Sequence, residues 1–274
     1  MNTPTPSTPR TRTETLANDL TLRIDEQGSG RPVLILHGGG GPQSVAGFSS
    51  MLSEHAHVLI PTHPGFGGTP RPEWFNGVDD LALAYSELLE RLDLHEVLIV
   101  GFSMGGWIAA ELAVRDTTRL SGIVLVDAVG IQVDGQEIAD VFSLTPDELS
   151  VLSYANPAPF RIDPATLSPE QIAGRATNFH ALRVYGSDMR DPKLRRRLAR
   201  VTIPALVLWG ESDGVVKPDY GRAYAQAFPN ARFTLIPGAG HVPQIEQPER
   251  LLNLVQEFAD SITPSSVTGS PAKR

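Results

Sequence analysis

Short runs of apolar residues recur along the chain and alternate with helical patterns. Because these runs are continuous rather than alternating, they predict strands covered on both faces, as in a parallel sheet. Apolar residues at helical spacing, as in 81–92 and 251–262, predict covering helices, and the strand character near residues 14–25 predicts a hairpin at the sheet edge. We expect an α/β fold with a mostly parallel, doubly wound sheet. The six runs are residues 31–38, 57–65, 95–103, 122–130, 205–212 and 231–240.

Two kinds of segment depart from this alternation. Residues 131–201 contain short helical patterns split by prolines, and structureless loops of more than about 15 residues are uncommon in compact domains. We therefore predict a helical cap inserted into a core of residues 14–130 and 202–262. Residues 1–13 and 263–274 are rich in Pro, Ser and Thr and are predicted to be disordered tails.

Composition argues against several classes of partner. The formal net charge is -8, from 23 basic and 31 acidic residues, which does not suit a broad surface for nucleic acid or for an anionic membrane. There is no Cys, so disulfides and thiolate chemistry are excluded. No apolar run approaches the ~20 residues that span a bilayer, and the first residues lack the apolar stretch of a secretory signal. We expect a cytoplasmic monomer or homodimer that acts on a small molecule.

Ser103 lies between an apolar run and the predicted helix Met104–Arg115, in the segment GFSMGG. Gly101, Gly105 and Gly106 surround it, which gives the spacing G-x-S-x-G. In a strand–turn–helix context this pattern is typical of a nucleophile elbow, where a strained turn presents the serine hydroxyl. The alternative is that the glycines only let the helix pack closely on the sheet, but that does not explain a serine at the turn.

A serine nucleophile needs a base and an orienting acid. His241 follows the last apolar run, and Asp213 follows the run before it, at the strand ends where α/β sheets carry functional groups. The chain order Ser103, Asp213, His241 is the order stated for hydrolases with a nucleophile elbow. Asp127, at the end of GIVLVD within the run 122–130, is a weaker candidate for the acid and could instead be a structural carboxylate in a turn.

The segment HGGGG after the first central run could bind an oxyanion through its N–H groups. We favour Gly39 as the donor, with Gly40 next and Met104 as the donor from the helix. The alternative is a flexible glycine turn. Phe102, Trp107 and Val242 are candidate pocket residues. Phe102 and Trp107 could equally belong to the core.

With these motifs, the chain resembles the α/β-hydrolase family over about residues 15–262. The likeness is carried by HGGGG, HPGFGGT, GFSMGG, GESDGVV and GAGHVPQIEQPE. The family inserts its cap after the sixth strand, which agrees with the irregular segment. The serine at the elbow argues against haloalkane dehalogenase and epoxide hydrolase chemistry, because those relatives use aspartate there.

HGGGG and GFSMGG also resemble the carbon–carbon bond hydrolases that cleave ring-fission products. Phe102 stands where those enzymes typically carry asparagine, and Val242 stands where they typically carry tryptophan. Thr62 replaces an aspartate that many family members carry, so the resemblance assigns no role to His63.

The resemblance and the motifs together imply a serine hydrolase that forms an acyl-enzyme on a small carboxylic ester or lactone, with no metal and no organic cofactor. One alternative is a C–C bond hydrolase of ring-fission dienones, which a cationic cap residue such as Arg183 or Arg190 in the pocket would favour. The other is a small-molecule receptor or binding module on the same fold.

Overall fold

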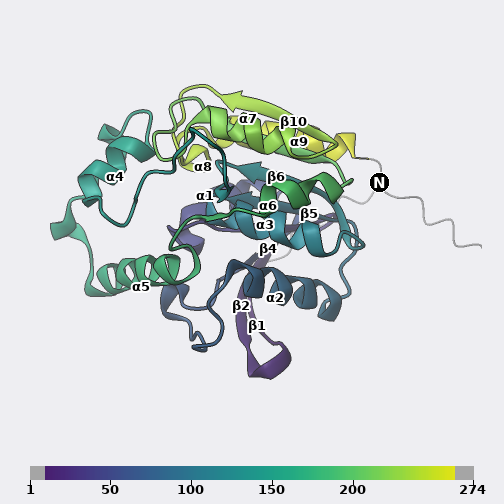
Figure 1. The fold of residues 1–274 in the computed structure, drawn as a ribbon. Coiled ribbons are helices and arrows are strands. Elements are labelled where there is room, and N and C mark those ends of the chain that lie inside the picture. The colour runs from purple at the N-terminus through teal and green to yellow at the C-terminus, as the bar shows by residue number, and fades with distance from the viewer. Residues whose placement is uncertain (1–9, 263–274) are drawn as a thin grey trace, which may run out of the picture.

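Eight strands form one sheet whose central part is parallel. The structure, a computed structural model, describes residues 10–262. The strands lie in the order β1-β2-β4-β3-β5-β6-β9-β10 (Figure 1). Parallel pairing runs from β4 through β3, β5, β6 and β9 to β10, so each apolar run forms a strand and the predicted sheet is confirmed. The bounds are β1 Arg10–Thr15, β2 Thr21–Gln27, β3 Pro32–Leu36, β4 His57–Pro61, β5 Val97–Phe102, β6 Leu120–Val126, β9 Ala205–Gly210 and β10 Ala231–Ile236.

An antiparallel hairpin of β1 and β2 forms one edge of the sheet, as predicted. However, β1 begins at Arg10, so the prediction of a disordered tail is wrong for residues 10–13. The sequence RTRTET has no apolar residue, but its β-branched threonines suit a strand. Arg10 donates two hydrogen bonds of 3.0 Å to the Glu26 carboxylate of β2. The other residues of the two predicted tails, 1–9 and 263–274, lie outside the described residues.

Helices cover both faces of the sheet. One apolar cluster is built from α2 (Val78–Arg91), α3 (Met104–Arg115) and α7 (Pro218–Gln226). The other is built from α1 (Ala46–Leu52) and α9 (Pro248–Ser261), which the single turn of α8 (Pro243–Glu246) precedes. Strands buried on both faces require such a layer on each side. Of the helices within residues 10–262, none has the length and apolar character that crossing a bilayer requires.

Between β6 and β9 the chain leaves the sheet. Figure 1 shows two helices of this segment, α4 and α5, to the left of the sheet. The segment thus has the helices expected of a cap, while its delimitation as a unit of residues 131–201 stays a prediction. Its elements are β7 (Gly130–Ile131), α4 (Pro146–Ser153), α5 (Pro169–Tyr185), β8 (Arg190–Asp191) and α6 (Leu194–Arg197).

Basic residues are concentrated in and around α6, a short helix with one buried face. Leu194, Leu198 and Val201 are at most 1% exposed. Arg197 is not fully solvated, because its guanidinium donates to the buried carboxylate of Glu111 in α3 over 2.9 and 3.3 Å.

Two fully buried histidines join the loops that follow β3 and β4. His63 Nε2–H donates to the carbonyl oxygen of His37 over 2.9 Å, and the backbone N–H of His63 donates to His37 Nε2 over 3.2 Å. The other ring nitrogens bond to the Tyr85 hydroxyl of α2 and to the Gly38 carbonyl oxygen. These partners assign a proton to Nε2 of His63 and to Nδ1 of His37. His63, for which the sequence predicts no role, therefore joins the loop after β4 to the loop after β3.

Both rings are held neutral. Burial lowers the pKa of His37 to about 4. Burial, together with the neighbouring His37, lowers the pKa of His63 well below its usual range. In the unfolded chain both rings bind a proton below a pH of about 6.5. The unfolded chain then binds more protons than the folded chain, so the contribution of each ring to stability is lost as the pH falls below that value.

We expect the wild-type protein to lose stability relative to a His63→Gln variant as the pH falls from 6 to 5. The relative loss in the free energy of unfolding should be about 1.4 kcal/mol per pH unit, the linkage of one proton. Urea unfolding of both proteins across this interval measures it, and all other titrating groups are common to the pair. His180→Gln, at an exposed position of α5, should keep the wild-type pH dependence. Parallel curves for wild type and His63→Gln would contradict the expectation.

Candidate active site

Ser103 occupies a strained turn between β5 and α3. Its backbone angles are φ 51° and ψ −114°, a conformation that costs roughly 1–3 kcal/mol in a residue with a side chain. A Cβ on Gly101 would lie 2.3 Å from the carbonyl oxygen of Gly105, and a Cβ on Gly105 would lie 2.0 Å from that of Leu36. The glycines therefore allow both the strained turn at Ser103 and the close packing of the helix on the sheet. The two explanations of the G-x-S-x-G spacing do not exclude each other.

Backbone hydrogen bonds fix this turn. The N–H of Ser103 donates to the carbonyl oxygen of Val126 in β6 over 2.9 Å. The carbonyl oxygen of Ser103 accepts from Gly106 over 3.0 Å and from Val129 over 3.3 Å. The turn is thus tied to the next strand, to its own helix and to the loop after β6, which leaves the hydroxyl a defined direction.

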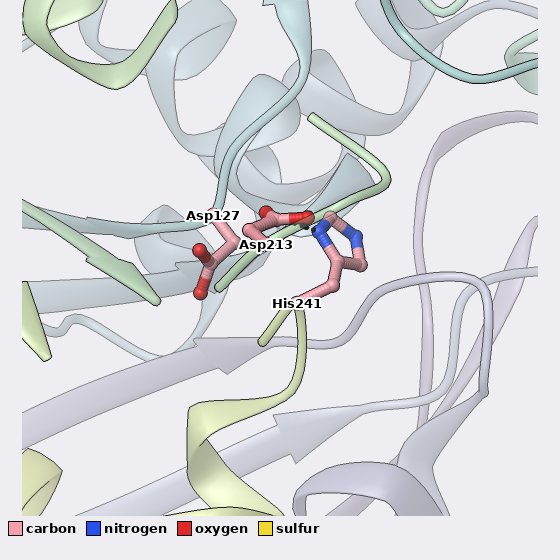
Figure 2. Close-up of side chains that lie close together, drawn as sticks. All are labelled: Asp127, Asp213 and His241. Atoms are coloured by element: carbon pink, nitrogen blue, oxygen red, sulfur yellow. Dashed lines mark hydrogen bonds and ion pairs between the residues drawn. The ribbon is translucent and has the colours of Figure 1, made fainter. Parts of the chain in front are cut away.

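Ser103, His241 and Asp213 form a line of hydrogen bonds. His241 Nε2 lies 3.0 Å from Ser103 Oγ, and His241 Nδ1 lies 2.8 Å from Asp213 Oδ2. Figure 2 shows the imidazole facing the Asp213 carboxylate. Asp213 follows β9 and His241 follows β10, so the carboxyl ends of three parallel strands bring the residues together. The structure thus joins the three side chains that the sequence predicts as a triad.

The partners of Asp213 determine the tautomer of His241. Asp213 Oδ1 accepts from the N–H groups of Val215 over 2.8 Å and Val216 over 3.0 Å. The Asp213 side chain is 0% exposed and that of His241 is 11% exposed. Because a carboxylate only accepts, His241 carries its proton on Nδ1 and leaves Nε2 to accept from the Ser103 hydroxyl. This geometry can move the hydroxyl proton to the imidazole.

Asp127, the weaker candidate for the acid, lies next to Asp213, on the side away from the imidazole of His241 (Figure 2). Its Oδ1 accepts from the N–H of Gly210 over 2.8 Å, whereas no hydrogen bond from within residues 10–262 reaches its buried Oδ2. Burial, and next the charge of Asp213, raises the pKa of Asp127 well above its usual range. Burial and the charge of Asp213 therefore favour the protonated form of Asp127, and Asp127 makes no hydrogen bond to His241.

One group of side chains among residues 10–262 converges closely enough to hold a metal ion, and it is Asp127, Asp213 and His241. One ligand atom from each lies within 4.8 Å of the others. His241 Nδ1 and Asp213 Oδ2 already bond to each other, and Asp213 Oδ1 accepts two N–H groups. An ion here would have to break the contact that orients the imidazole, so the donor set suits proton transfer better than metal binding.

The glycine loop after β3, residues 38–41, lies against Ser103. A Cβ on Gly38 would lie 3.0 Å from Ser103 Cβ. The N–H of Gly41 donates to the carbonyl oxygen of Gly38 over 3.1 Å, which closes a tight turn with Gly39 and Gly40 at its tip. Met104 is the first residue of α3, and the first N–H groups of a helix have no intrahelical acceptor. The predicted oxyanion donors thus lie on two segments that flank Ser103, and their role stays a prediction.

The three candidate pocket residues differ in their surroundings. Phe102 is 3% exposed and packs edge-to-face on Phe48, with ring centroids 5.6 Å apart. Trp107 is 7% exposed and lies against Gly130, where a Cβ would be 2.3 Å from the indole ring. Val242 is partly exposed. The first two make core contacts, and a pocket role for any of the three stays a prediction.

Glu246, which the sequence does not predict as a site residue, holds the loop that carries His241, called here the histidine loop. Its carboxylate accepts from the N–H of Gly240 over 2.6 Å and from the N–H groups of Ala155 and Asn156 over 3.0 and 3.2 Å. It therefore ties the residue before His241 to the chain that follows α4. The one signal for it in the sequence is its place in GAGHVPQIEQPE.

The end of α4 adds two further contacts that no sequence pattern marks. The N–H of His241 donates to the carbonyl oxygen of Ser153 over 2.7 Å. The N–H of Gly214, next to Asp213, donates to the carbonyl oxygen of Leu152 over 2.9 Å. Every residue carries such a carbonyl, so these acceptors could be found only from the fold.

Comparison with known proteins agrees with this geometry. The family model described as the alpha/beta hydrolase family matches residues 33–254. A curated 2-hydroxy-6-oxo-2,4-heptadienoate hydrolase from Pseudomonas putida (strain F1) is 29% identical over 271 residues, covering 89% of this chain and 94% of the relative. Lipase 3 from Moraxella sp. (strain TA144) is 26% identical, covering 85% of this chain and 79% of the lipase.

Solved structures give the same fold. The esterase RhEst1 from Rhodococcus sp. ECU1013 superposes with a TM-score of 0.76 at 20% identity, covering 92% of this chain and 99% of the esterase. At that identity the likeness concerns the fold alone. Since the family model spans most of the sequence and the sheet has the matching topology, the chain belongs to the alpha/beta hydrolase family.

Proposed function

We propose that the chain is a serine hydrolase that cleaves a small carboxylic ester or lactone through an acyl-enzyme. The observation that carries the proposal is the contact of 3.0 Å between Ser103 Oγ and His241 Nε2, with Asp213 on the other ring nitrogen. Ser103 and His241 are partly exposed, so a small substrate can reach the hydroxyl. A relative described as Lipase 3, from Moraxella sp. (strain TA144), supports an ester as the substrate class.

In the proposed acylation step, Ser103 Oγ attacks the carbonyl carbon while its proton passes to His241 Nε2. The carbonyl oxygen becomes an oxyanion, which the N–H groups of Gly39 and Met104 would stabilise. Asp213 holds the Nδ1 tautomer and stabilises the imidazolium that forms. The C–O bond to the alcohol then breaks, and the alcohol leaves with the proton from Nε2.

In the proposed deacylation step, a water molecule takes the place of the alcohol. His241 Nε2 accepts a proton from the water as its oxygen attacks the acyl carbon. The bond between the acyl carbon and Ser103 Oγ breaks, and Oγ recovers the proton. The products are a carboxylic acid and the free enzyme, so no other reactant is needed.

C–C bond hydrolysis of a ring-fission dienone is a second candidate, because the Pseudomonas putida relative is described as a 2-hydroxy-6-oxo-2,4-heptadienoate hydrolase. A cationic cap residue in the pocket would favour it. The Arg183 guanidinium instead lies 4.9 Å from the ring centre of Phe142 and donates to its carbonyl oxygen, and Arg190 is exposed. These placements support the ester as the first candidate.

We expect the wild-type protein to hydrolyse 4-nitrophenyl esters, and we expect Ser103→Ala to abolish the activity. Loss of the nucleophile should lower kcat by about 10⁶-fold. Release of 4-nitrophenolate from acetate to decanoate esters measures the activity, and the optimum chain length measures the acyl pocket.

The outcomes separate the candidates. Hydrolysis that persists in Ser103→Ala would contradict the proposed nucleophile. Serine-dependent cleavage of dienones but not of esters would select the C–C hydrolase. Binding of small molecules without turnover of any substrate would select the receptor.

We expect Asp213→Asn to lower kcat by about 10⁴-fold, because an amide can donate to Nδ1 and so favours the wrong tautomer of His241. Asp127→Asn is the matched control. Asp127 bonds to Gly210 rather than to His241, and an amide preserves its shape and its acceptor oxygen, so kcat should stay within about threefold. Steady-state kinetics of both variants on one ester tests the pair. Equal losses in the two variants would contradict the assignment of the acid.

A further inference from the structure

One polar side chain of helix α5 is buried between two loops of the core. Asn178 is 7% exposed. Its Nδ2–H donates to the carbonyl oxygen of Gly40 over 3.1 Å, and its Oδ1 accepts from the N–H of Gly67 over 2.8 Å. One partner is an acceptor and the other a donor, so the orientation of the amide is fixed. Asn178 therefore joins the loop after β3 to the loop after β4.

The loop after β3 needs such an anchor. Four consecutive glycines, residues 38–41, have no side chains to restrict the backbone, and glycine loses more conformational entropy on ordering than any other residue. Within this loop the hydrogen bond from Gly41 to Gly38 closes the turn. The bond from Asn178 fixes the carbonyl of Gly40, and this carbonyl adjoins the peptide that carries the Gly40 N–H. Loss of this bond would free the Gly40–Gly41 peptide, which is next to the peptide that carries the Gly40 N–H, one of the predicted oxyanion donors.

The fit between Asn178 and this loop is tight. Gly41 has φ +80°, and a Cβ there would lie 2.4 Å from Asn178 Nδ2. Position 41 of the loop therefore requires glycine, because the amide of Asn178 occupies the space that a side chain would need. A buried amide that loses its hydrogen-bond partners destabilises the fold, because its polar atoms are then neither solvated nor paired.

The same face of α5 makes three more contacts with the two loops. A Cβ on Gly39 would lie 2.7 Å from Leu182 Cδ2, and a Cβ on Gly65 would lie 3.3 Å from Ala181 Cβ. The Tyr185 hydroxyl donates to the carbonyl oxygen of Pro64 over 2.9 Å. Positions 178, 181, 182 and 185 share one helix face. This face is docked on the loops along two turns of the helix.

We infer that Asn178 is a positioning residue for the oxyanion-binding loop, so that helix α5 is a fixed part of the catalytic machinery and not a lid that moves away from it. The inference rests on the proposed function, because it assigns Asn178 to the stabilisation of an oxyanion formed at Ser103. Asn178 acts through the backbone of Gly40 and does not touch the reacting atoms.

The test compares Asn178→Ala and Asn178→Asp with His180→Ala on a 4-nitrophenyl ester at pH 8. The Ala variant loses both bonds. The Asp variant, when ionised, still accepts from Gly67 but cannot donate to the carbonyl of Gly40. His180 is an exposed residue of the same helix, and its variant should behave as wild type. Titration with a fluorophosphonate that labels Ser103 gives the concentration of active sites, so a fraction of misfolded protein does not lower the measured kcat.

We expect both Asn178 variants to lose about 10- to 100-fold in kcat per active site, somewhat less than removal of an oxyanion donor. KM should change by less than about threefold, and the pH midpoint of kcat/KM should stay at its wild-type value, because His241 and Asp213 are untouched. A residue with a purely structural role would lower the melting temperature and the active fraction without this loss in kcat. A kcat per active site within twofold of wild type in both variants would overturn the inference.

Amide hydrogen exchange gives a readout that needs no turnover. Peptides that cover residues 38–41 should exchange faster in both Asn178 variants than in wild type, and those of His180→Ala should not. The Gly67 amide should exchange faster in Asn178→Ala only, because aspartate still accepts from it. If wild type hydrolyses no ester, the proposed ester function fails, and exchange alone decides whether Asn178 anchors the loop. Unchanged exchange at residues 38–41 would then overturn the inference.

Discussion

The backbone of Ser103 is the constraint on which the rest of the site depends. A residue with a side chain holds φ near 50° and ψ near −114° only where its surroundings fix it. Here the surroundings are two backbone–backbone approaches: α3 lies so close to the ends of β3 and β5 that a Cβ on Gly101 or Gly105 would overlap a carbonyl oxygen. The strain at Ser103 is therefore balanced by the packing of the sheet on α3.

Away from this turn, each group of the site is held by hydrogen bonds in which at least one partner is a backbone group. Asp213 is fixed by the N–H groups of Val215 and Val216, and the histidine loop is fixed by the carbonyl of Ser153 and the carboxylate of Glu246. The segment between β6 and β9 contributes from two sides, because the end of α4 bonds to the loops of Asp213 and His241 and α5 bonds to the glycine loop. Displacing this segment would break these hydrogen bonds and so disturb the geometry around Ser103.

What the sequence could predict follows from which interactions are local. The apolar runs predict strands because burial on both faces leaves a continuous pattern, and the triad could be placed because each member follows a strand. The part of β1 at residues 10–13 could not be predicted, because its pairing with β2 depends on Thr and on the ion pair of Arg10 with Glu26 and not on apolar residues. Asn178 could not be found either, because its partners lie 138 and 111 residues away and are backbone atoms.

The two buried carboxyl groups near His241 differ in one physical respect, the number of donors that each receives. Asp213 accepts from two backbone N–H groups and from the imidazole, whereas Asp127 accepts from one backbone N–H group among residues 10–262, that of Gly210. Two charges buried within 4.8 Å of each other repel strongly. The repulsion is lower when the group with fewer donors is protonated, which is the direction in which burial and Asp213 move the pKa of Asp127. In that form Asp127 supports the end of β9, the strand that precedes Asp213, without adding a second charge beside the imidazole.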